Sequence, residues 1–393
     1  MIKRYLTGLA SRLIQEQLYK KGKINIKIHN FSKFLPLTKQ IYFLSFYLNP
    51  VLEKIDHIKV KGLSSKKLTE LKNFDYKSYN FLSDEVKVSE SFLNKFKSSS
   101  RFNNFSLINI STNKYKFGFN YNLDVYSNKD ATGEMINLSN RFFSQQEVVE
   151  GSKSRYITDV VTKNKSDKIL LLGSGPSVDN FDFNKYSDYD IMICNSLVIS
   201  KNISELNNIK YVVFGDPIFH SGPAKYPGIF RKTLVRNYEN KDIKIFTPSR
   251  DYLIYKHYLP NEIFNKMYFF EIKQEKFNYN LNKSFYVNAT QNILTLAMLP
   301  FAMNNYKKIF FAGFDGNSNV KKDYYWKHSE KYQFQKELND IKNIHPGFFK
   351  LDFNEYNEDH NKVLQSIIDL RTGISFKNLT ASNIPALQKL TNS

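Results

Sequence analysis

The chain has 393 residues, of which 41% are hydrophobic, and this content is enough for buried cores and excludes wholesale disorder. Domains usually hold about 100–200 residues, so the length predicts two of them. The formal net charge of +20 at pH 7 favours partners that are anionic: polyanions, anionic membrane surfaces or acidic substrates. A single cysteine, Cys194, excludes an intrachain disulfide and fits a reducing cytoplasm.

Residues 1–160 are predicted to form an N-terminal α+β domain that serves acceptor binding or membrane association. Between Lys3 and Tyr19 leucines recur at helical spacing with basic residues between them, which fits a core-facing helix better than a membrane-surface helix. The apolar run 41–48 is too short to span a bilayer and predicts a buried strand or helix. Loose alternation over 106–126 predicts strands, and the polar stretch 149–167 predicts a linker.

The start of the chain, Met1-Ile-Lys-Arg, lacks the apolar stretch of a secretory signal. No apolar run in the sequence approaches the roughly 20 residues that a spanning helix needs. We therefore expect a cytoplasmic protein, with peripheral attachment to the inner membrane as an option because the first fifty residues are rich in lysine and arginine.

From Lys168 onward, short apolar runs alternate with polar or glycine-bearing loops. Runs of this length are typical of buried parallel strands, and a helical stretch from about 291 to 304 precedes the last of them. The alternation predicts that residues 161–393 form an α/β domain with a doubly wound, mostly parallel, Rossmann-like sheet. Ligands bind such sheets at the carboxyl ends of the strands, so residues that follow the runs are the candidate site. The runs are 169–172, 191–194, 211–214, 243–246 and 308–312.

The first of these loops has the sequence Gly173-Ser174-Gly175-Pro176-Ser177. Glycines let the backbone turn sharply and approach a ligand, and a helix starting near Pro176 would aim free N–H groups at phosphate. The loop is neither a P-loop nor a full dinucleotide fingerprint. A purely structural strand–glycine–helix turn remains the alternative.

Polar side chains follow the later runs as well. Asn195 offers a donor and an acceptor for a nucleobase or sugar, and Asp216 and Asp315 could each accept from a hydroxyl or form an ordinary turn. No Asp-x-Asp pair stands at a strand end, so the sequence predicts no metal site.

Two further segments carry titratable groups. Tyr324 and Tyr325 lie in a predicted loop after the last strong strand, where a neutral hydroxyl could donate to a departing phosphate. His360 opens a predicted helix, and an imidazole with a free pKa near 6.5 can accept a proton at neutral pH. His328 is a second candidate base, and either histidine could equally be a surface residue.

The order of these pieces resembles that of the bacterial sialyltransferases of glycosyltransferase family 42. That family has a Gly-Asn-Gly-Pro-Ser loop, then Cys-Asn, Phe-x-Asn-Pro and Gly-Ile-Asp at later strand ends, tyrosines in a loop and a histidine before a helix. The resemblance covers roughly residues 168–390. The matching positions here are Gly173–Ser177, Cys194-Asn195, Phe214–Pro217, Gly313-Phe314-Asp315, Tyr324 with Tyr325, and His360.

The resemblance implies a sialyltransferase-like variant of the GT-A fold and metal-independent, inverting transfer of sialic acid from a CMP-sugar to a hydroxyl of a cell-surface glycan, such as lipooligosaccharide or capsule. It implies that His360 is the base and that Tyr324 and Tyr325 hydrogen-bond the leaving phosphate. It implies no cofactor, since the CMP-sugar is a substrate. The implied nucleotide- and substrate-binding residues are Gly173, Ser174, Gly175, Pro176, Ser177, Asn195, Asp216, Thr290, Gly313 and Asp315.

Three departures from the family pattern leave the donor open. Ser174 and Asp216 each stand where the family has asparagine, and the family's arginine has no clear match, Lys283, Asn288 and Thr290 being nearest. A related nonulosonic acid or Kdo is therefore an alternative donor sugar, and a Maf-type enzyme acting on flagellin is an alternative identity. A basic nucleic-acid-binding protein is the non-enzyme alternative, although the basic residues do not cluster with aromatics into a binding motif. A homo-oligomer is also left open.

Overall fold

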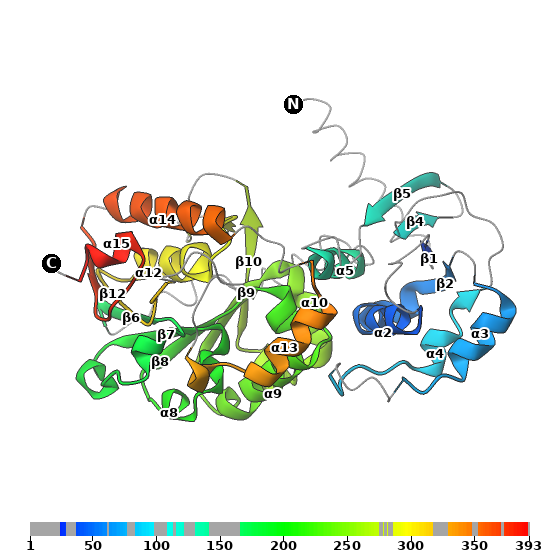
Figure 1. Cartoon of the computed structure of the whole chain (residues 1–393), viewed down its shortest axis with the longest axis horizontal. Coiled ribbons are helices and arrows are strands. Elements are labelled where there is room, and N and C mark those ends of the chain that lie inside the picture. The colour runs from blue at the N-terminus through cyan, green and yellow to red at the C-terminus, as the bar shows by residue number, and fades with distance from the viewer. Residues whose placement is uncertain are drawn as a thin grey trace.

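The computed structural model describes residues 24–28, 37–60, 63–76, 83–97, 108–112, 115–121, 130–140, 166–274, 278, 281, 286–316, 329–347, 353–370 and 373–391. The described strands form two sheets, which Figure 1 shows side by side with helix α5 (Ala131–Asn140) between them. Several predicted features lie outside the described residues. They are the helix at 3–19, most of the linker, His328, Tyr324 and Tyr325.

The larger sheet has eight strands in the order β11-β10-β9-β8-β7-β6-β12-β13, and every neighbouring pair is parallel. This confirms the predicted fold class. The predicted runs are β6, β7, β8, β9 and β12, whereas β10, β11 and β13 were not predicted. The bounds are β6 Lys168–Leu172, β7 Asp190–Cys194, β8 Ile209–Val213, β9 Lys244–Pro248, β10 Met267–Lys273, β11 Tyr286–Asn288, β12 Lys308–Ala312 and β13 Ser375–Asn378.

Alternate residues of the buried strands face two separate cores, because side chains in a strand point to opposite faces. Leu170 and Leu172 of β6 belong to one core with helices α9 (Lys225–Tyr238) and α10 (Tyr252–Tyr258). Ile169 and Leu171 belong to the other core, with α12 (Leu299–Asn305) and α14 (Phe353–Leu370). Figure 1 shows α12 and α14 on one face of the sheet and α9 on the other, as a doubly wound fold requires.

The strand order reverses between β6 and β12. Strands β7 to β11 follow one another on one side of β6, whereas β12 pairs with β6 on its other side. In open α/β sheets, ligands bind outside the carboxyl ends of the strands at such a switch point. The two loops that meet there begin at Gly173 and Gly313.

The smaller sheet is mixed, with the order β3-β2-β1-β4-β5. Strand β1 pairs parallel with β2 and antiparallel with β4. Strands β4 and β5 confirm the strands predicted within 106–126, and the apolar run 41–48 is helical, as part of α2. The bounds are β1 Ile24–Ile28, α2 Leu37–Leu48, β2 Ile55–Val60, α3 Ser65–Lys72, α4 Glu90–Leu93, β3 Phe96–Lys97, β4 Ile108–Thr112 and β5 Tyr115–Tyr121.

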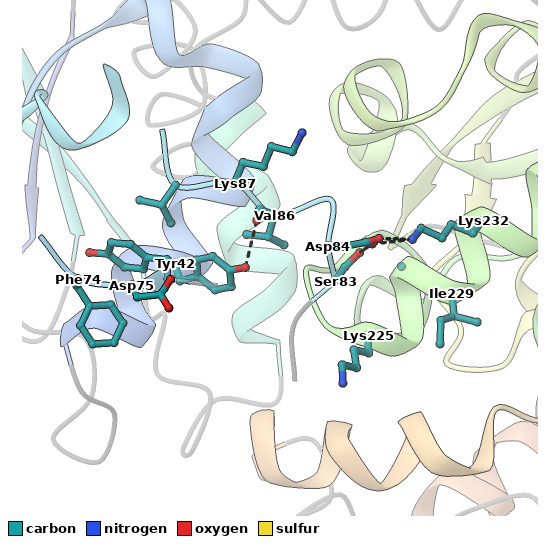
Figure 2. A pocket seen from close by; sticks show the side chains of 13 residues that line it. Tyr42, Phe74, Asp75, Ser83, Asp84, Val86, Lys87, Lys225, Ile229 and Lys232 are labelled. Carbon is teal, nitrogen blue, oxygen red and sulfur yellow. Dashed lines mark hydrogen bonds and ion pairs between the residues drawn. The ribbon is translucent and has the colours of Figure 1, made fainter. Parts of the chain in front are cut away.

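The two parts share an apolar core and a buried ion pair. Buried residues of α2 and α5 belong to the same core as those of α9 and α10. Arg231 of α9 is 1% exposed; its Nη1 donates to the carbonyl oxygens of His220 at 2.9 Å and Gly222 at 3.0 Å, and its guanidinium pairs with Glu85. Figure 2 shows the neighbouring pair, in which Lys232 Nζ lies 2.7 Å from Asp84 Oδ1. The division of the chain near residue 160 stays a prediction.

No helix among the described residues is long and apolar enough to cross a membrane. Shorter elements connect the two parts of the chain. The remaining elements are η1 Asn49–Lys54, η3 Pro176–Val178, η4 Phe183–Tyr186, η5 Asn195–Ile199, α8 Lys201–Ser204, η6 Pro217–Ser221, η7 Ser249–Asp251, α11 Asn261–Phe264, η8 Leu294–Met298, η9 Glu330–Tyr332, α13 Gln335–Ile344 and α15 Pro385–Gln388.

Candidate functional site

A cavity of about 680 Å³ lies over the carboxyl ends of the larger sheet. Loops that follow strands β6 to β12 contribute to its wall, and its size is within the range of small-molecule sites, about 300–1,000 Å³. Six of the predicted binding residues therefore come together from distant parts of the sequence. They are Gly173, Ser174, Asn195, Asp216, Thr290 and Gly313.

The rest of the first loop packs against the loop after β12 and does not line the cavity. The N–H of Gly175 donates to Gly313 O at 2.8 Å, and the N–H of Ser177 donates to Asp315 Oδ2 at 2.9 Å. The Ser177 hydroxyl also donates to the Asp315 carboxylate. The predicted helix at Pro176 is a three-residue 3-10 turn, so the expected free amides at a helix start are already used inside the protein. In this structure Asp315 ties the two loops together.

Asn195 stands in an unusual backbone conformation at the end of β7. Its φ of 48° makes it the one non-glycine residue with positive φ in the described part of the chain. Asparagine tolerates this left-handed region better than most residues, and strained backbone often occurs at functional sites. The conformation turns the chain directly after Cys194, so that Asn195 lines the cavity.

Asp216 caps the π-helical turn η6, because its Oδ1 accepts the N–H of Ile218 at 2.9 Å. Burial is the main cause that raises the pKa of Asp216 to about 6. His220, at the end of the same turn, lines the cavity and is 2% exposed, with Nδ1 2.9 Å from Asp216 O. Burial lowers the pKa of His220 to about 3, so its ring is neutral at pH 7. No sequence motif pointed to His220, whose only signal was its place four residues after Asp216.

The large positive charge of the chain is not gathered at this cavity. Among the described residues that line it, Arg250 is the one with a cationic side chain, whereas Asp130, Glu134 and Asp216 carry carboxyl groups. The Arg250 guanidinium is held in place by Gly215, whose carbonyl oxygen accepts from Nη2 at 2.8 Å. Arg250 follows β9, a strand after which no site residue was predicted.

His360 lies behind the cavity wall and is 6% exposed. Its Nδ1 is 3.4 Å from Thr295 Oγ1, and that hydroxyl is 3.1 Å from Thr290 Oγ1, which belongs to a cavity-lining residue. Two hydroxyl groups therefore connect His360 to the cavity. Burial lowers the pKa of His360 to about 4. Tyr356, one helical turn earlier, does line the cavity and donates to Gln291 O at 2.9 Å.

Helix α5 supplies the wall that faces these strand ends. The lining residues from this segment are Asp130, Thr132, Gly133, Glu134 and Asn137. This segment precedes the resemblance described above, so no motif in the sequence pointed to it. A part of the chain that was predicted to be a separate domain thus forms one side of the candidate site.

A second cavity, of about 840 Å³, lies between the first part of the chain and α9 (Figure 2). Its lining includes Tyr42, Phe74 and Lys225, but none of the predicted site residues and no strand end of the larger sheet. Within the described residues, no three His, Cys, Asp or Glu side chains gather as a metal site in either cavity. The first cavity is therefore the candidate active site.

No family model matches the chain, and no curated protein matches it. The solved structures that it resembles include an apo α-2,3-sialyltransferase from Campylobacter jejuni, 18% identical, with 57% of this chain and 80% of that chain covered and a TM-score of 0.34. The monofunctional α-2,3-sialyltransferase Cst-I of that organism gives the same identity and coverage and a TM-score of 0.35. The sialyltransferase CstII of that organism, in complex with a trisaccharide acceptor and CMP, is 13% identical, with 56% and 87% covered and a TM-score of 0.31. At this distance the likeness assigns neither a family nor a function.

Proposed function

We propose that this protein is a glycosyltransferase that moves sialic acid or a related nonulosonic acid from a CMP-sugar to a hydroxyl group of a cell-surface glycan. One observation carries the proposal: residues of the ordered motif set, far apart in sequence, line a single cavity at the strand ends. In this proposal Gly173, Ser174 and Asn195 hold the nucleotide, and Asp216 and Thr290 contact the sugars.

The anionic groups of a CMP-sugar need a positive partner, and Arg250 is the cation that the described lining offers. A guanidinium can bind a carboxylate or phosphate through two parallel hydrogen bonds. Its anchoring to Gly215 O fixes the direction of approach, which lowers the entropy lost when the donor binds. We assign Arg250 to the donor carboxylate or phosphate.

Transfer with inversion passes through a transition state in which the sugar has oxocarbenium character. In this proposal the acceptor hydroxyl gives its proton to Thr290 Oγ1, Thr290 gives its own hydroxyl proton to Thr295 Oγ1, and Thr295 gives its own to His360 Nδ1. Tyr324 and Tyr325 donate hydrogen bonds to the departing phosphate of CMP, and each such preorganised donor lowers the barrier by about 3–4 kcal/mol. No metal and no cofactor takes part.

The acceptor proposed here is lipooligosaccharide or capsule, and the protein is proposed to be cytoplasmic with peripheral contact to the inner membrane. The basic residues of the first fifty positions support this contact, because the cytoplasmic leaflet is anionic. A CMP-Kdo transferase and a Maf-type flagellin glycosyltransferase would use the same kind of nucleotide site with another sugar or with a protein acceptor. A homo-oligomer is compatible with all three.

A thermal-shift panel with CMP, UDP, GDP and their sugars tests the proposal. Ligand at 100 times its Kd stabilises a protein by about 2.7 kcal/mol, so only the correct nucleotide raises Tm clearly. We expect a selective shift with CMP and CMP-sialic acid. A shift with UDP or GDP alone, or salt-sensitive retention on DNA without any CMP response, would contradict the proposal.

Turnover in EDTA tests the metal-independent mechanism separately. We expect the rate of transfer from CMP-sialic acid to be the same with and without the chelator. Strict dependence on an added divalent metal would replace the tyrosine-based mechanism and leave the nucleotide assignment untouched.

A further inference from the structure

Helix α5 is fixed firmly beside the candidate active site. Ser139 Oγ donates to Tyr47 O of α2 at 2.5 Å, and Asn140 Nδ2 donates to Arg250 O at 2.8 Å. Met135 and Ile136 are at most 2% exposed and lie in the core shared with α9 and α10. The helix is therefore held from both sides, and its remaining face is presented to the cavity.

The face turned to the cavity carries polar groups at helical spacing. Asp130, Glu134 and Asn137 are three or four residues apart, which places them on one side of a helix. Gly133 is next to Glu134 in the sequence, and all four residues line the cavity. Within the described residues, the side chains of Glu134 and Asn137 have no hydrogen-bond or ion-pair partner. Burial, and then the nearby Asp130, raise the pKa of Glu134.

Gly133 leaves open space in the middle of this face. A Cβ placed on Gly133 would have no atom within 4 Å, although glycine inside a helix is less stable than alanine. A helical glycine with room in front of it lets a ligand approach the backbone closely. The cavity therefore extends to the surface of α5.

A buried polar group lies across from this face. His220 belongs to η6, which packs against α5, and it is 2% exposed while lining the cavity. Of its two ring nitrogens, Nδ1 alone has a hydrogen-bond partner among the described residues, the backbone of Asp216. Its other ring nitrogen is left for a ligand in the cavity.

Given the proposed function, on which this inference rests, we infer that α5 is the wall that binds the acceptor and that the acceptor ends in an uncharged, hydroxyl-rich sugar. Carboxylates of Asp130 and Glu134 accept hydrogen bonds from sugar hydroxyls, and the amide of Asn137 both donates and accepts. The same carboxylates repel a terminal sugar that is itself anionic. The donor, which is anionic, is assigned to Arg250, whose segment η7 packs against α5 at the end of the helix that carries Asn140.

The experiment compares acceptor and nucleotide binding in two variants of the full chain. Glu134→Gln removes a charged acceptor of hydrogen bonds, and Gly133→Leu fills the open space; Glu70→Gln, on the exposed surface of α3, is the matched control. The probes are CMP-sialic acid as donor, with lactose and the methyl β-glycosides of galactose, glucose and N-acetylgalactosamine as uncharged acceptors, and 3′-sialyllactose as the anionic one.

We expect wild-type protein to use at least one uncharged probe and to prefer it to sialyllactose. Glu134→Gln and Gly133→Leu should raise the KM for that probe about tenfold or more while the Kd for CMP, measured by calorimetry, stays within about twofold. The control should change neither value. Unchanged acceptor KM in both variants, parallel loss of CMP affinity, or preference for sialyllactose would overturn the inference.

Direct binding separates this inference from the proposed function. If wild-type protein binds no CMP, the proposed function fails, and saturation-transfer NMR with the four uncharged sugars then tests α5 alone. In that case, sugar binding that is lost in Gly133→Leu with an unchanged Tm supports the inference that α5 binds the acceptor sugar. Binding that persists in the variant, or no sugar binding by the wild type, rejects it.

Discussion

The glycines after β6 and β12 depend on each other. A Cβ on Gly173 would lie 2.4 Å from Gly313 O, and a Cβ on Gly313 would lie 2.3 Å from Gly173 O. Gly313 also has a φ of 74°, in the left-handed region that favours glycine. The glycines of the motif are thus explained by close packing of two loops at the switch point. Gly173, Ser174 and Asn195, the residues proposed to hold the nucleotide, line the cavity beside this contact.

Replacing Gly313 by alanine should destabilise the fold by about 2 kcal/mol or more, because the left-handed conformation alone costs about 1–2 kcal/mol and the Cβ meets fixed backbone. Gly373→Ala is the matched control, since Gly373 has a φ of 84° but open space around its Cβ position. Urea denaturation measures both. Equal losses in the two variants would show that the contact with Gly173 does not matter.

His360→Ala tests the residue assigned as base. We expect kcat to fall by about 10²–10⁴ with the Kd for CMP and the Tm nearly unchanged, because the ring takes a proton but does not hold the nucleotide. His220→Ala is the comparison, since His220 is the histidine that directly lines the cavity. Near-normal kcat in His360→Ala together with its loss in His220→Ala would move the role of base to His220.

Helix α5 has one face in the core and another in the cavity. Its buried residues Met135, Ile136 and Leu138 join the core that continues to α9, while Glu134 and Asn137 face the candidate site. One face of α5 packs in the core, and the other face is polar and lines the cavity. Gly133, on the cavity face, lowers the helical propensity of the element.

Gly133→Ala should therefore stabilise the protein by about 0.5–1 kcal/mol, because alanine is the better helix former and its Cβ meets no atom within 4 Å. The free energy of unfolding from urea denaturation checks this. A loss of stability would mean that the helix is more tightly surrounded than the structure shows.

Arg231 links the first part of the chain to the part that carries the larger sheet. Its guanidinium contacts Glu85 from the first part of the chain and the carbonyl oxygens of His220 and Gly222 beside the candidate site. It also lies 5.3 Å from the ring centroid of Phe46 in α2. Packing of the first part of the chain is in this way coupled to the geometry of η6.

Arg231→Ala should cost about 3–5 kcal/mol in the free energy of unfolding, because it leaves a carboxylate and two carbonyl oxygens without their buried partner. Lys232→Ala is the control, since the Lys232–Asp84 pair is more than half exposed and such pairs contribute about 0–1 kcal/mol. Similar losses of unfolding free energy in both variants would show that Arg231 contributes no more to stability than the exposed Lys232–Asp84 pair does.

Buried histidines should make the stability depend on pH. Burial lowers the pKa of His345 to about 4. As the pH falls through 6.5, the ring of His345 is therefore protonated in the unfolded chain but stays neutral in the folded chain. The stability that this neutral ring contributes is present above pH 6.5 and is lost as the pH falls toward 4. Asp216 and Asp251 act in the opposite sense, because burial raises the pKa of each to about 6.

His345→Gln removes the contribution of His345 to this pH dependence and leaves those of the other titratable groups in place. From pH 7 to pH 4 the wild type should lose up to about 3 kcal/mol relative to this variant, at about 1.36 kcal/mol for each unit of pKa difference. Urea denaturation at a series of pH values measures the difference. A constant difference between the two proteins at every pH would show that His345 does not titrate differently on folding.

The class of the fold from residue 168 onward could be predicted from the sequence, because buried parallel strands such as β6 and β12 are continuous apolar runs that can be recognised without tertiary context. The sequence also showed which strand ends carry Asn195 and Asp216. It did not reveal β11 or β13, since β11 has three residues and β13 is a partly exposed edge strand.

The other residues of the candidate site could not be predicted from the sequence. Packing between segments that are far apart in the chain brings Arg250, His220 and the α5 residues to the cavity. A local sequence pattern does not show which distant segments will pack against each other. The same packing turned Asp315 toward Ser177 and placed His360 behind Thr295. Spacing along a chain fixes the element on which a side chain lies, but only the fold fixes what that side chain faces.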